Sequence, residues 1–141
     1  MTIGVGRVGL IVLVTALVFL AGEAVMLPNV MQPLFKSILG DQILDGLRLG
    51  PAAIFYIIHI CGLTWFASLP ALRAGRAIAA LRDGALLGLV AYGCYELTSW
   101  TIMVTWSPVL VVADMAWGAT ISGLSAWAAV LAARALWPPA A

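Results

Sequence analysis

Three carboxylic acids, Glu23, Glu96 and Asp114, stand inside long apolar stretches of this sequence. A charged side chain at the centre of a membrane helix costs about 2.5–3.5 kcal/mol on insertion scales, so it usually faces other helices and has a partner there. Tyr56 and His59, from another apolar stretch, could reach a similar depth and supply such partners. We therefore take these five residues as the first candidates for chemistry, which would be binding of a polar group or transfer of protons.

Other chemistries have weaker support. Two acids and the only histidine, His59, could ligate a metal, but the Glu-x-x-His pairing of di-iron bundles is absent from the sequence. No Ser or Cys stands in a recognisable nucleophile motif. Cys61 and Cys94 lie in apolar runs and are interpreted as small buried hydrophobic residues rather than as a disulfide. We expect no metal, no cofactor, no catalytic residue and no enzyme, with a lipid-modifying enzyme as the remaining alternative.

The composition indicates whether the segments that carry these residues lie in water or in lipid. Charged residues make up 9 % of the 141-residue chain and apolar residues 64 %, against about 25 % and 45–50 % in soluble domains. Six acids and seven bases cannot coat the surface that folding leaves exposed. The chain is therefore expected to lie in lipid, and without a basic cluster it is not expected to bind nucleic acid.

About 20 mainly apolar residues are needed to span the hydrocarbon core of a bilayer. Four stretches meet this requirement, and prolines or polar residues mark their ends. The prediction is an all-α integral membrane four-helix bundle forming a single transmembrane domain over residues 1–141, with spans at about 5–27, 52–69, 84–104 and 109–133.

Between the first two spans, residues 28–50 have a mixed pattern. Apolar residues recur every three to five positions, with charged residues between them. This pattern favours one or two short amphipathic helices lying in the membrane interface; a plain solvated loop is the alternative.

The basic residues predict the orientation, because Lys and Arg collect on the cytoplasmic side. With four spans, five arginines share one side, whereas Lys36 and Arg48 take the other. We expect a bacterial inner-membrane protein with both termini in the cytoplasm. Four tryptophans near predicted helix ends fit an interfacial aromatic belt that needs no functional explanation: Trp65, Trp100, Trp106 and Trp137.

Small and polar residues share one face of each of the last two spans. The third carries Gly84, Gly88, Tyr92, Glu96 and Ser99 at steps of three or four, with Tyr95 beside them, and the fourth carries Asp114, Gly118, Ser122 and Ser125. Small residues at such spacing let membrane helices approach closely. The acids are therefore expected on packing faces, in one polar layer in the periplasmic half of the membrane.

Two kinds of role are consistent with such a layer. The acids could be protonated, hydrogen-bonded and purely structural. Alternatively they form a site that binds a lipid or small amphipathic ligand or relays protons; its candidate residues are Glu23, Tyr92, Tyr95, Glu96 and Asp114, with Tyr56, His59 and Trp117 less certain. A function of another class is an accessory subunit of a larger membrane complex, which would meet its partner through helix faces or residues 28–50. Membrane lipids are the other expected partners.

Several stretches resemble a known family of small bacterial membrane proteins, the domain-of-unknown-function family 2177. The resemblance covers nearly the whole chain and is carried by residues 15–20 leading to Glu23, by 55–56, 62–63 and 66–67, and most specifically by 88–98 and 114–118. The family favours Asp at the positions of Glu23 and Glu96 and Asn at that of Ser99, and has no histidine at that of His59. It has no established activity, so the resemblance implies architecture and leaves mechanism open, while its lack of this histidine argues further against a metal site.

Overall fold

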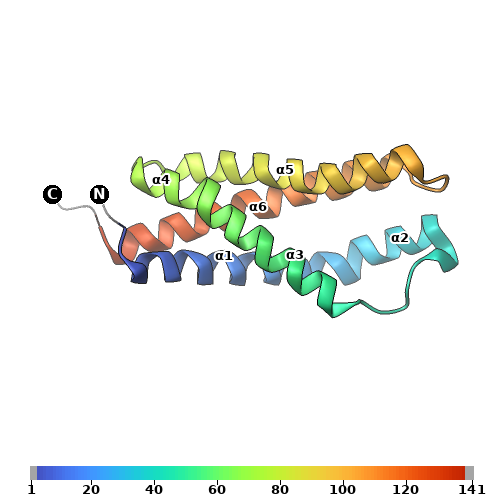
Figure 1. Ribbon diagram of the computed structural model, residues 1–141, viewed down its shortest axis with the longest axis horizontal. Coiled ribbons are helices and arrows are strands. Elements are labelled where there is room, and N and C mark those ends of the chain that lie inside the picture. The colour runs from blue at the N-terminus through green and yellow to red at the C-terminus, as the bar shows by residue number, and fades with distance from the viewer. Residues whose placement is uncertain (1–2, 139–141) are drawn as a thin grey trace.

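The computed structural model describes residues 3–138, and every regular element among them is a helix (Figure 1). Four helical runs of 38, 25, 26 and 29 residues are long and apolar enough to cross a membrane. The protein is a helical membrane bundle, as the composition predicted. The four runs are Val5–Gln42, Leu49–Arg73, Ala77–Ile102 and Pro108–Leu136.

The first run does not end at Pro28, where the sequence predicted its end. Helix α1 (Val5–Met26) continues through the π-helical turn η1 (Leu27–Met31) into α2 (Gln32–Leu39) and the short 3-10 turn η2 (Gly40–Gln42). Proline lacks an N–H and its ring clashes with the carbonyl four residues earlier. The wider π turn accommodates the proline.

The first run is longer than the hydrocarbon core of a bilayer is thick. At 1.5 Å per residue its 38 residues extend for about 57 Å, against a core of about 30 Å, and tilting by the usual 0–40° does not absorb that excess. Figure 1 shows α2 continuing the line of α1. In the segment predicted to be amphipathic, α2 is the longest helical element, and irregular chain follows at 43–48. The apolar side of α2 packs on Trp106, Leu110 and Val111. It consists of Leu34, Phe35, Ile38 and Leu39.

The second run also continues past a proline. Helix α3 (Leu49–Gly62) passes through a π-helical segment, η3 (Leu63–Ser68), into α4 (Leu69–Arg73), although Pro70 was predicted to end the span. In Figure 1 this run crosses the other helices diagonally.

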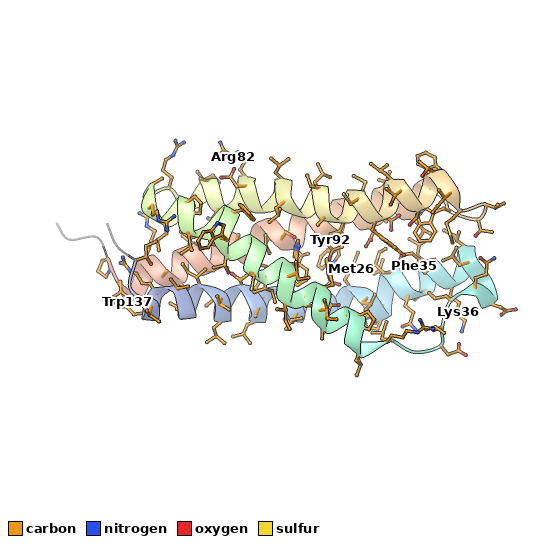
Figure 2. All side chains as sticks on the ribbon, viewed as in Figure 1. Met26, Phe35, Lys36, Arg82, Tyr92 and Trp137 are labelled. Carbon is orange, nitrogen blue, oxygen red and sulfur yellow. The ribbon has the colours of Figure 1, made fainter. Side chains whose placement is uncertain are left out.

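The last two runs form an antiparallel hairpin. Helix α5 (Ala77–Ile102) starts earlier than the predicted 84. Its first turns include Arg82 and Asp83, an exposed ion pair with an N···O distance of 2.7 Å. Arg82 points away from the bundle in Figure 2. Helix α6 (Pro108–Leu136) begins at the predicted proline, and the Ser107 side chain caps its start.

Glycines bring α5 and α6 into close contact, as their spacing predicted. A Cβ on Gly88 would lie 2.2 Å from the carbonyl oxygen of Gly118, and one on Gly118 would lie 2.2 Å from Cγ of Tyr92. Both distances are shorter than any van der Waals contact. The polar side chains that α5 and α6 carry near these glycines are therefore held at a fixed distance from one another.

The two ends of the bundle differ. The start of α1, the end of α6 and α4 lie at one end, which we call the termini end, and α2 and the α5–α6 turn lie at the other, the hairpin end (Figure 1). Trp65, Trp100 and Trp137 are exposed, as a membrane belt requires.

Two predictions about burial are wrong. Trp106 is only 8 % exposed, so it does not belong to the aromatic belt. Cys61 and Cys94 are both exposed. In lipid an apolar side chain gains little by leaving the surface, so its apolar character alone does not predict burial.

Candidate functional site

Glu23 connects three helices. Its Oε1 accepts a hydrogen bond from the Tyr92 hydroxyl of α5 and another from the Trp117 indole Nε1 of α6, each 2.9 Å long. Tyr92 lies in the middle of the bundle in Figure 2. The acid is buried, and two donors from distant parts of the chain converge on one of its oxygens. We call these three residues the Glu23 cluster.

Glu96 is the centre of a second group. It is fully buried, and its Oε2 accepts a hydrogen bond of 2.8 Å from Trp106 Nε1. Asp114 on α6 is a second buried acid close to it. Glu96 Oε1 has no donor among the residues that the structure describes, and a proton on Asp114 would be a candidate donor for it. We call Glu96, Trp106 and Asp114 the acid-pair cluster.

The two clusters are neighbours on the same pair of helices. Tyr92 and Glu96 are four residues apart on α5, and Asp114 and Trp117 are three apart on α6, which is about one helical turn in each case. The predicted polar layer is thus two adjoining clusters, and all three acids take part.

The hydrogen bond of His59 does not involve any of the three acids. Its Nε2 is 2.8 Å from the Ser122 hydroxyl of α6, and its ring lies 5.0 Å from that of Phe19 and 5.3 Å from that of Phe55. Within residues 3–138 no group of three His, Cys, Asp or Glu could hold a metal ion. The histidine therefore joins α3 to α6 through a buried polar contact inside an aromatic cage.

Tyr56 and Tyr95 differ from Tyr92, because neither donates a hydrogen bond to an acid within residues 3–138. Tyr56 is half-buried beside Phe19, with ring centroids 5.9 Å apart. Tyr95 is 52 % exposed, and its ring meets that of Trp106 edge-on at 5.5 Å. Both tyrosines instead line cavities, Tyr56 one and Tyr95 another.

Two cavities of about 330 and 460 Å³ adjoin at the hairpin end and share Leu27, Gln32 and Leu47 in their walls. Each lies within the range of about 300–1,000 Å³ typical of small-molecule sites. Glu23 and Tyr56 line the smaller cavity, and Arg48, Tyr95 and Trp106 line the larger. We call the two together the hairpin-end cavity. Its other walls are largely apolar, among them Leu20, Pro28, Phe35, Leu39, Ile43, Leu44 and Met103.

Trp106 and Ser122 take part in these contacts, but the sequence did not identify either of them as a site residue. Trp106 resembled an interfacial tryptophan, and only its position ten residues after Glu96, across a tight turn, could have suggested that it folds back. Ser122 shares a face with Asp114 and Gly118, but its partner lies on α3, and nothing in the spacing identifies that partner.

A family model described as "Predicted membrane protein (DUF2177)" matches residues 8–131. Because the match covers most of the chain, the protein belongs to this family, as the resemblance of residues 88–98 and 114–118 indicated. No curated protein and no solved structure matches the chain.

Proposed function

We propose that this member of the DUF2177 family of predicted membrane proteins binds an amphipathic molecule in the hairpin-end cavity, and that Glu23 receives the polar end of that molecule. The observation that carries the proposal is the cavity itself, which has apolar walls and a buried carboxyl group on its surface. Apolar walls suit an acyl chain or another apolar body. A carboxylate can only accept hydrogen bonds, so the polar end should be a donor, such as an ammonium or hydroxyl group.

The Glu23 cluster supports this role because it holds the acid in place. Tyr92 and Trp117 both donate to Oε1, and a carboxylate has lone pairs for further donors on its second oxygen. The acid is therefore positioned before a ligand arrives, which reduces the entropic cost of binding.

The charges support an orientation for the site. Five arginines lie at the termini end, whereas the bases of the hairpin end are Lys36, paired with Asp45 at 3.1 Å, and Arg48. Under the positive-inside rule, the proposal places both termini in the cytoplasm and the cavity toward the periplasmic side of a bacterial inner membrane.

We expect the detergent-solubilised protein to bind phosphatidylethanolamine at least about tenfold more tightly than phosphatidylcholine, the difference that one hydrogen bond to a charged group makes. The first headgroup has N–H donors for Glu23, whereas the second has a quaternary ammonium without them. Native mass spectrometry with each lipid added in turn measures the two affinities. The variant Glu23→Gln should lose most of this preference, because a neutral amide attracts the ammonium group far less than a carboxylate does.

The matched control is Asp41→Asn, which removes an exposed acid at the same end that does not line the cavity. It should keep the wild-type preference. Equal affinities of the wild-type protein for the two lipids would contradict the proposal, as would an unchanged preference in Glu23→Gln.

A second candidate function, proton handling, is favoured by the acid-pair cluster. Two facing buried carboxyl groups exchange protons as a pair, and the apparent titration belongs to both residues together. We expect the infrared band of protonated carboxyl groups to shift with pH in the wild-type protein. Either Glu96→Gln or Asp114→Asn should change that response, whereas Glu23→Gln should retain it. A response that neither of the first two substitutions alters would eliminate this candidate.

A further inference from the structure

A third cavity lies at the termini end, between the start of α1 and the run from α3 to α4. Its volume is about 330 Å³. Arg73 stands at one end and Cys61 at the other, with the rest of the wall mostly apolar. We call it the Arg73 groove. Its lining is Ile3, Val8, Val12, Cys61, Thr64, Trp65, Leu69 and Arg73.

The helical stretch that lines the Arg73 groove is about as long as one leaflet is thick. Arg73 is twelve residues from Cys61 along the same helical run, which corresponds to about 18 Å. Half of the hydrocarbon core is about 15 Å thick. An acyl chain entering beside Arg73 can therefore follow the groove past Trp65 to the level of Cys61.

The charges around the opening of the groove select an anion. The described part of the termini end holds five arginines and one acid, Asp83, which already pairs with Arg82. Arg73 is exposed and has no hydrogen-bond or ion-pair partner within residues 3–138. Basic pockets between membrane helices on the cytoplasmic side are typical sites for anionic headgroups.

We propose that the Arg73 groove binds an anionic phospholipid of the surrounding leaflet, with its phosphate at Arg73 and an acyl chain between α1 and the α3–α4 run. The site is separate from the hairpin-end cavity, shares no lining residue with it, and does not depend on the function proposed for it.

The two cysteines provide a test within one protein. Cys61 lines the groove, whereas Cys94 is an exposed cysteine on α5 that does not line it. Delipidated protein in maltoside micelles is alkylated with N-ethylmaleimide, and the modified peptides are counted by mass spectrometry. Phosphatidylglycerol should slow the alkylation of Cys61 and leave that of Cys94 unchanged, and phosphatidylcholine should need a much higher concentration for the same effect.

Two variants connect the protection to the guanidinium group. Arg73→Gln should raise the phosphatidylglycerol concentration needed for half-protection by about fivefold. Arg82→Gln removes an arginine from the same end that lies outside the groove, and it should leave this concentration unchanged. Equal protection by both lipids, equal protection of both cysteines, or equal effects of the two variants would each overturn the proposal.

Discussion

Replacing Gly88 with alanine should destabilise the bundle by about 3 kcal/mol, the upper part of the range of about 1–3 kcal/mol for overpacking a well-packed interior. The added Cβ would lie 2.2 Å from the carbonyl oxygen of Gly118 and 2.6 Å from the Ser122 hydroxyl. The nearest atom is backbone, so it cannot turn aside as a flexible side chain can. The two helices must separate, and the hydrogen bond between Ser122 and His59 would be disturbed with them.

The measurement is unfolding in mixed micelles of maltoside and dodecyl sulfate, followed by circular dichroism. The matched control is Gly9→Ala in α1, where an added Cβ meets no atom within 4 Å. The control should unfold at the same dodecyl sulfate fraction as the wild-type protein or at a higher one. Equal stability of Gly88→Ala and Gly9→Ala would show that α5 and α6 are not packed as closely as the structure has them.

Trp106→Ala should cost about 3–5 kcal/mol, as for other buried tryptophans. The ring is almost fully buried, packs against Phe35 of α2 at 5.8 Å and against Tyr95, and donates to Glu96. Its loss removes one of the contacts that hold α2 against the hairpin and leaves a buried carboxyl oxygen without its donor. Protease cleavage between α2 and α3 should become faster in this variant.

Two further substitutions separate these effects. Trp106→Phe keeps most of the ring and removes the N–H, so it should cost less, about 1–3 kcal/mol for the buried acceptor left unpaired. Trp100→Ala truncates a tryptophan that is 47 % exposed on α5, and it should change stability by no more than about 0.5 kcal/mol. Similar losses for Trp100→Ala and Trp106→Ala would mean that both belong to the aromatic belt, as the sequence had indicated.

The comparison of these tryptophans shows why the site could be predicted only in part. A tryptophan near a helix end is typical of a membrane interface, and the exposure of Trp65, Trp100 and Trp137 is consistent with this rule. Trp106 departs from it because the α5–α6 turn folds its ring back toward Glu96. The partner of an indole depends on the path of the turn, which residue type and spacing do not describe.

The helix boundaries were predicted less well than the helix faces. Pro28 and Pro70 were expected to end helices, but π-helical segments at both places let the chain continue. A proline removes one backbone hydrogen bond. Near Pro28 and Pro70 the helix widens and continues, and a proline in the sequence does not by itself distinguish this outcome from the end of a helix.

The sequence by itself determined that this is a helical membrane protein, because too few charged residues exist to coat a soluble surface. It also determined which faces of the last two helices meet, since Gly88 and Gly118 allow a close approach that larger residues prevent. Only the tertiary structure decided the partners of the acids: Glu23 with Tyr92 and Trp117, and Glu96 with Trp106 and Asp114. Helical periodicity places a side chain on a face and at a depth, but the rotation and tilt of neighbouring helices decide which oxygen meets which donor.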